Sequence, residues 1–204
     1  AAWLRFDEAR THGKSYILYL NDGSGANYIG LREENGSTRQ ARFMVKNAHQ
    51  AAPATLYAEN FFCAVGEWCH YVAMVSYGIK HPLILTRNGV YNNDWVLSEG
   101  AAVNDDGFGY RWAALGRDPW AAGKYFHGAM RDVRIYDRHL PLEAVSQLYR
   151  DGADLVPTAA PTTSPLGTVA TWSLDGGSAD DANGAFNGEA IDVLTTSDRS
   201  GNSN

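Results

Sequence analysis

Long apolar runs, lysine and cysteine are all scarce in this chain of 204 residues. No apolar run approaches the roughly 20 residues that a membrane-spanning helix needs, which excludes a membrane span. Only four residues are lysine and the formal net charge is −6, so the composition gives no basic surface for nucleic acid. Residues 1–7 lack the basic end and the apolar stretch of a signal peptide, and they begin as though inside a strand.

The two cysteines, Cys63 and Cys69, are too few for a structural zinc site, which needs four ligands at paired spacings. In an extracellular protein they are expected to form a disulfide that closes a short loop. Two reduced, buried thiols are the alternative, and the sequence leaves both open. The chain-entropy model gives so short a loop a stabilisation of only about 2–3 kcal/mol.

Most of the chain consists of short segments in which apolar and polar residues alternate. Aromatic residues make up 12% of the composition and glycines number 21, which is typical of short strands joined by tight turns. Asn35-Gly36 and Asn88-Gly89 indicate two-residue hairpin turns, because these residues tolerate the positive φ angles that such turns need. The predicted strands are residues 15–20, 27–32, 41–45, 55–62, 68–77, 83–87, 111–116 and 127–136.

One segment departs from the strand pattern. Leu142, Val145 and Leu148 are apolar at helical spacing. Pro141 suits the first turn of a helix and Gly152 suits its end. This short helix is all the α-helical content that the sequence predicts.

The composition changes after the predicted helix. Residues 155–165 hold three prolines and no charge, so they are predicted to form a semi-rigid spacer that packs no core. In a secreted protein, its hydroxyl side chains are candidates for O-glycosylation, namely Thr158, Thr162, Thr163 and Ser164. Residues 169–174 then predict a new strand, and the tail beyond them predicts loops with weak strands at 186–188 and 190–194.

Three stretches carry motifs that occur together in one family. Residues 66–73 have the pattern Gly-x-Trp-x-His followed by Val-Ala, and Asn88-Gly89 stands where the hairpin of that family would follow. Residues 125–140 read Phe-x-Gly, then Asp-Val-Arg-Ile-Tyr, and a Leu-Tyr helix comes next. Over about residues 1–152 the chain thus resembles the laminin-G-like, concanavalin-A-like jelly-roll family. The resemblance implies an all-β antiparallel jelly-roll sandwich with one short C-terminal helix, and it implies core positions for Trp68 and Tyr136.

The order of these motifs differs from that of the family. Such domains open with a strand of the type Trp-x-Phe-Asp-Gly, and this opening is missing near residue 1. Similar residues follow the spacer instead, beginning at Thr171-Trp172 and continuing to Phe186-Asn187-Gly188. The resemblance therefore implies three parts: a sandwich without its opening strands at 1–152, a Pro/Thr-rich linker at 153–167, and the opening strands at 168–204.

Three arrangements would explain this order. The tail could complete its own domain as a circular permutation, complete the domain of the next chain, or belong to a tandem array of which this chain is one piece. A sheet without these strands would leave an open edge, and a head-to-tail exchange that does not close on itself builds filaments. The spacer favours repeats or strand exchange over permutation. The absence of an internal repeat argues the other way.

Catalytic motifs are absent. Glycosidases of the jelly-roll type resemble one another in a Glu-x-Asp-x-Glu strand, which this chain lacks. Glu33-Glu34 and Asp105-Asp106 are adjacent pairs at predicted turns, expected to point to opposite faces or into solvent. The histidines show no metal-binding spacing, and His70 is expected to be structural. We expect no enzymatic activity.

Three kinds of binding or modification site remain as expectations. Sugars stack on exposed aromatic rings, so Trp95, Tyr110, Trp112 and Trp120 are the candidates for carbohydrate binding; burial of these rings in packing or in an interface is the alternative. Calcium is the one cofactor that the resemblance implies, and Asp105 and Asp106 are its candidate ligands. Asn35-Gly36-Ser37 is an acceptor for N-glycosylation.

Together these features predict an extracellular or cell-surface module with a structural or adhesive role. Its expected partners are copies of itself or neighbouring repeats, joined head-to-tail through segment 168–204 in a fibre or filament. A carbohydrate-binding, lectin-like module with glycan ligands is the alternative. No nucleic acid and no membrane span enters either hypothesis.

Overall fold

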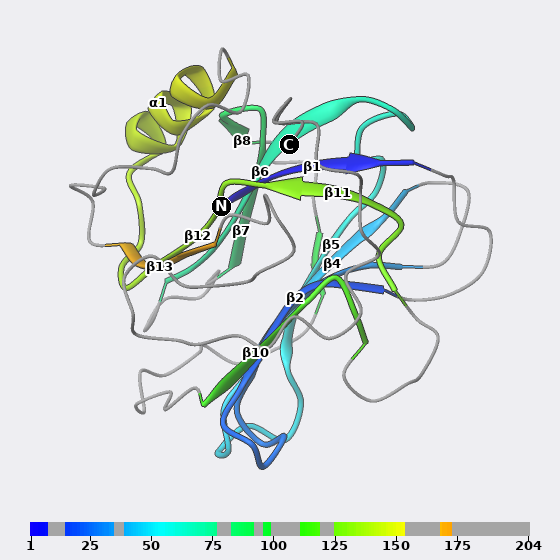
Figure 1. Ribbon diagram of the computed structural model, residues 1–204. Coiled ribbons are helices and arrows are strands. Elements are labelled where there is room, and N and C mark those ends of the chain that lie inside the picture. The colour runs from blue at the N-terminus through cyan, green and yellow to red at the C-terminus, as the bar shows by residue number, and fades with distance from the viewer. Residues whose placement is uncertain are drawn as a thin grey trace, which may run out of the picture.

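The computed structural model describes residues 1–7, 15–34, 39–76, 83–91, 96–98, 111–118, 125–153 and 168–172. These residues form two large antiparallel sheets, one two-stranded sheet and one helix, α1 (Leu142–Ala153). Figure 1 shows that α1 lies beside one of the sheets, on the side away from the other. The predicted all-β sandwich with one short helix is thereby confirmed.

The first sheet has five strands. Their order across the sheet is β11 (Gly128–Arg131), β1 (Ala2–Phe6), β6 (Trp68–Val75), β7 (Leu83–Arg87) and β8 (Val90–Tyr91). Helix α1 packs on its outer face, where Val145 joins Val72 and Met74 of β6 in one buried cluster. The β7–β8 turn has φ of 52° at Asn88 and 75° at Gly89, as the Asn-Gly signature predicts.

The second sheet has six strands. Their order is β10 (Trp112–Leu115), β2 (Ser15–Asn21), β3 (Tyr28–Glu33), β4 (Ala41–Lys46), β5 (Ala54–Ala58) and β9 (Val96–Ser98). Each neighbouring pair is antiparallel. Two further strands, β12 (Val133–Tyr136) and β13 (Thr168–Trp172), pair with each other.

The main core fills the space between the two sheets. Strand period explains which side chains enter it, because successive side chains of a strand point to opposite faces. In β4, Phe43 and Val45 are buried in this core, whereas Met44 belongs to a second cluster on the outer face. The largest fully buried core side chains are Phe43, Phe61, Phe62, Leu4, Leu85 and Val45.

One predicted element differs from the observed ones. Residues 127–136 were expected as one strand, but the chain turns at Asp132, where φ is 51°, and divides into β11 and β12. Gly152 was expected at the end of the helix, and α1 ends one residue later, at Ala153, with Gly152 buried. None of the helices in the described part of the chain is both long and apolar enough to cross a bilayer.

The expectation that Trp68 lies in the core is wrong. Its neighbour Cys69 points into the main core, so Trp68 faces outward and is half-buried. The guanidinium carbons of Arg5 and Arg131 lie 5.4 Å and 4.9 Å from the centre of its ring. Tyr136 is half-buried against the cluster under α1 and lies outside the main core.

Candidate functional site

Strand β12 is bordered on both sides by distant parts of the chain. On one side, the Arg134 amide donates to the Ala1 carbonyl, and the Ala1 amino group donates to the Arg134 carbonyl, each at 2.8 Å. On the other side lies β13, with Val133 opposite Trp172 and Arg134 opposite Thr171. The described strand from beyond the Pro/Thr-rich segment therefore pairs with β12 in a two-stranded sheet (Figure 1).

The local sequence explains the position of β12. The positive φ of Asp132 ends β11 and starts a new strand direction, and the Asp132 carboxylate accepts a hydrogen bond of 2.6 Å from Arg134 Nε. Val133 is 4% exposed and packs with Ile135 in one apolar cluster. Arg134 lies between them on the opposite face, as the predicted alternation requires.

A closed polar cluster occupies the outer face of the six-stranded sheet. Arg32 and Arg42 stand opposite each other on β3 and β4, and both guanidinium groups bind Glu34 Oε1, at 2.5 Å and 3.1 Å. Arg32 also contacts the Tyr16 ring, and Arg42 lies 5.1 Å from the centre of the Tyr57 ring. Burial is the main reason that the pKa of Tyr16 is raised.

This cluster corrects one part of an expectation from the sequence. Glu33 and Glu34 were expected to point to opposite faces or into solvent, and the solvent alternative is wrong, because they are only 5% and 8% exposed. A buried carboxylate needs compensating charge, and the two arginines supply it for Glu34. The sequence signal for this cluster is a pair of opposite charges two residues apart, Arg32 and Glu34. A strand places two such residues on the same face. The cluster is a structural ion pair that holds β3 and β4 together.

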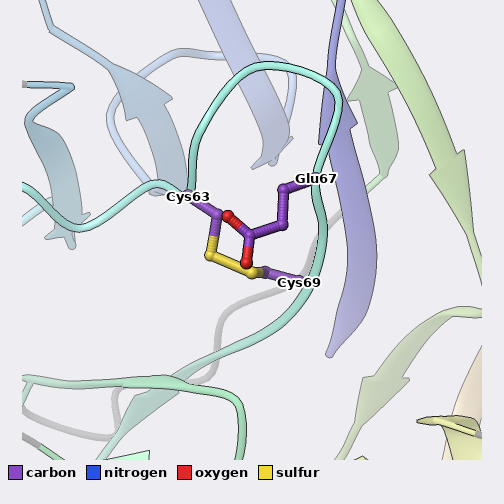
Figure 2. A group of neighbouring side chains, drawn as sticks. All are labelled: Cys63, Glu67 and Cys69. Carbon is purple, nitrogen blue, oxygen red and sulfur yellow. A yellow bond between two sulfur atoms is a disulfide. The ribbon is translucent and has the colours of Figure 1, made fainter.

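The cysteine loop is the second group of chemically active side chains. Cys63 and Cys69 form a disulfide with a Cα–Cα distance of 6.4 Å, so the first of the two predicted redox states is the observed one. Figure 2 shows the Glu67 carboxylate beside the two sulfur atoms, all within 4.8 Å. A metal would need free thiolates, and here each sulfur is bonded to the other. The Glu67 carboxylate instead accepts the Ala64 amide at 3.2 Å.

The loop between β2 and β3 carries a partly exposed acid, Asp22. Hydrogen bonds from the Ser24 hydroxyl and amide and from Asn27 Nδ2 lower the pKa of Asp22 to about 2. The Asp22 carboxylate is thus used to fix the turn. The group of Cys63, Glu67 and Cys69 is the one cluster of three candidate metal ligands within the described residues.

His70 lies beneath helix α1 and is 3% exposed. Burial, followed by the positive charges of the Ala1 amino group and Arg134, lowers the pKa of His70 to about 3. Its ring is 5.3 Å from that of Trp3, and Trp3 in turn stacks on Tyr149 of α1 at 5.7 Å. The neutral imidazole acts as a packing group between the sheet and the helix.

Most residues predicted for binding or modification lie outside the described residues. These are Trp95, Tyr110, Trp120, Asp105, Asp106, Asn35, Thr158, Thr162, Thr163 and Ser164. Trp112 opens β10 opposite Asn21, and only its backbone is described. Carbohydrate binding, calcium binding and glycosylation at these positions stay predictions.

The comparison with protein families agrees with this architecture. Residues 1–146 match the Laminin_G_3 family model, which is described as the concanavalin A-like lectin/glucanases superfamily. No curated protein and no solved structure matches the chain significantly. The matched region runs from β1 into helix α1, and therefore spans both sheets of the sandwich. By fold and by sequence, this chain belongs to the concanavalin A-like lectin/glucanase superfamily, as a laminin-G-like domain.

Proposed function

We propose that this protein is an extracellular structural or adhesive module that assembles head-to-tail with copies of itself or with neighbouring repeats. One observation carries the proposal: a strand from beyond the Pro/Thr-rich segment, β13, pairs with β12. Strand β13 is separated by a spacer from the domain with which it pairs. Such an element is able to complete another copy by the same contacts.

The spacer gives this strand its reach. Segment 154–167 separates the end of α1 from the start of β13 and contains Pro157, Pro161 and Pro165. Proline-rich chain is extended at about 3.1 Å per residue, so these residues bridge up to roughly 40 Å. This length is sufficient to carry β13 onto an adjacent sandwich, and a chain of such exchanges grows as a filament because a head-to-tail contact need not close.

The disulfide supports the extracellular setting. The Cys63–Cys69 bond is closed, and disulfides persist mainly in oxidising compartments. The family and the Pro/Thr-rich segment fit the same setting. An intracellular form would keep the two thiols reduced.

The test is the native mass of the full chain over a range of concentrations. We expect species at multiples of 22.3 kDa that increase with concentration. Ala170 stands opposite Ile135, whose backbone groups face β13 because those of Arg134 face Ala1. Ala170→Pro should therefore abolish the multiples by removing a ladder donor.

Thr171→Pro is the matched control. Thr171 stands opposite Arg134, so its amide points away from β12 and the proline removes no bond to that strand. The multiples should persist in this variant. A single 22.3 kDa species at every concentration would refute the assembly proposal in favour of a chain that completes only itself.

Carbohydrate binding is the second candidate. Tyr91 and Tyr125 are 41% and 37% exposed and stand at the two ends of the aromatic-rich stretch, and exposed rings are suited to stacking against sugars. We expect a glycan array to detect binding that is lost on Trp95→Ala, Trp112→Ala or Trp120→Ala. Tyr57→Ala, which lies outside that stretch, is the control variant. An array without any hit would contradict this candidate.

A further inference from the structure

Strand β12 pairs with Ala1 along one edge and with β13 along the other. The amide and the carbonyl of Arg134 both bind Ala1. In an antiparallel sheet the amide and carbonyl of one residue point to the same side, and those of its neighbours point to the other. The backbone groups of Val133 and Ile135 are therefore the ones that face β13.

We propose that this outer edge of β12 is an acceptor site for strand Thr168–Trp172 of a second copy of this chain, and that the incoming strand takes the same register as the chain's own β13. The inference rests on the proposed function, and it specifies the surface, the partner segment and the alignment through which the assembly forms.

The register is defined by the faces of β12. Val133 is almost completely buried and Ile135 packs with it, while Arg134 lies on the other face in an ion pair with Asp132. Trp172 is opposite Val133 and Ala170 is opposite Ile135, so the apolar positions of the two strands coincide. A slip by one residue would bring Trp172 opposite the charged Arg134 and exchange the faces of the whole strand.

The second copy is favoured over other partners because the donor strand is already encoded in the chain. Exchange between copies replaces each β12–β13 contact by an identical one. The balance then depends on the spacer and on concentration: the length and stiffness of the spacer set the effective concentration of β13 at its own β12. Crowding of copies, as in a fibre or at a cell surface, shifts the strand from its own sandwich to its neighbour's.

A pair of cysteines across the ladder tests this site in the full chain. Arg134 and Thr171 are opposite each other in a pair without mutual backbone hydrogen bonds, in which the Cα atoms of antiparallel strands are about 4.5 Å apart. This separation suits a disulfide. The native cysteines are already joined and do not compete.

The decisive sample mixes two single variants, Arg134→Cys and Thr171→Cys, and oxidises them at high concentration. We expect a disulfide-linked dimer on a non-reducing gel that neither variant gives when oxidised alone, because the bond between residues 134 and 171 then forms only between chains. Arg134→Cys mixed with Thr168→Cys is the off-register control, because these residues are not opposite each other. This mixture should give no disulfide-linked heterodimer. Tyr136→Cys with Thr168→Cys, which are also opposite, repeats the test if the Arg134 variant does not fold.

Native mass of the same samples separates the two proposals. Multimers with the in-register heterodimer support the acceptor site. Multimers that give no heterodimer, or that are linked equally well in the off-register control, refute the acceptor site. Head-to-tail assembly would then occur through another surface. The double variant Arg134→Cys/Thr171→Cys tests linkage within one chain. If it links efficiently while all samples are monomers without any heterodimer, both the acceptor site and head-to-tail assembly are refuted.

Discussion

Gly152 of helix α1 lies directly against the indole ring of Trp3 in strand β1, with no space for a side chain between them. A Cβ atom at residue 152 would stand 2.9 Å from Trp3 Cε2 and 3.1 Å from Cζ2. Trp3 is itself 4% exposed and stacks on Tyr149 of the helix. The contact therefore fixes the last turn of α1 to the five-stranded sheet.

Gly152→Ala should destabilise the protein even though alanine favours a helix. Overpacking of this kind costs about 1–3 kcal/mol, and a cost in the upper part of this range outweighs the roughly 1 kcal/mol that alanine gains over glycine within a helix. The free energy of unfolding from urea titration measures the effect. Trp3→Phe should relieve the clash, so the double variant should lose less than the sum of the two single losses. A Gly152→Ala variant as stable as the natural protein would show that α1 does not dock in this way.

Glu34→Gln should destabilise the protein strongly. The change leaves the guanidinium groups of Arg32 and Arg42 without the carboxylate that compensates them, and breaking such a buried pair costs about 3–5 kcal/mol. Asp137→Asn is the matched control, because the Arg138–Asp137 pair is exposed and such pairs contribute about 0–1 kcal/mol. Equal losses in the two variants would contradict a buried cluster on β3 and β4.

Acidification should reveal the buried imidazole of His70. Its pKa is about 3 in the folded chain and 6.5 as a free side chain, so the unfolded chain binds the proton first. The contribution of His70 to the free energy of unfolding is complete above pH 6.5 and is lost as the pH falls toward 3. The free energy of unfolding should fall by up to about 1.4 kcal/mol per pH unit.

The slope should be measured between pH 6.5 and 5, where most carboxylates stay ionised. His70→Gln should reduce this slope of the free energy of unfolding against pH, whereas His139→Gln, at an exposed position, should leave the slope unchanged. The same slope in all three proteins would mean that His70 is accessible to protons in the folded state.

Reduction of the Cys63–Cys69 disulfide should lower the free energy of unfolding. The loop it closes is short, and the chain-entropy model gives about 2–3 kcal/mol for it. The measurement is unfolding with and without a dithiol reductant. The double variant Cys63→Ser/Cys69→Ser should be insensitive to the reductant, and an equal insensitivity of the natural protein would show that the bond does not contribute.

The sequence by itself determined the fold class and most of the strands. Alternation with a period of two, Asn-Gly turns such as Asn88-Gly89 and the motif around Val133-Arg134-Ile135-Tyr136 are local signals, and each of them is read over a few residues. The proline-rich segment and the strand after it are also visible as a change of composition, which is why a tail strand could be expected at all.

The tertiary structure decided what these local signals could not contain. The ion cluster of Arg32, Glu34 and Arg42 exists only because β3 and β4 align in register, and Gly152 proved to be a packing site because a distant indole approaches it. The sequence left open where the strand at Thr168–Trp172 would pair. Its place beside β12 follows from long-range backbone hydrogen bonding, which the order of residues along the chain does not reveal.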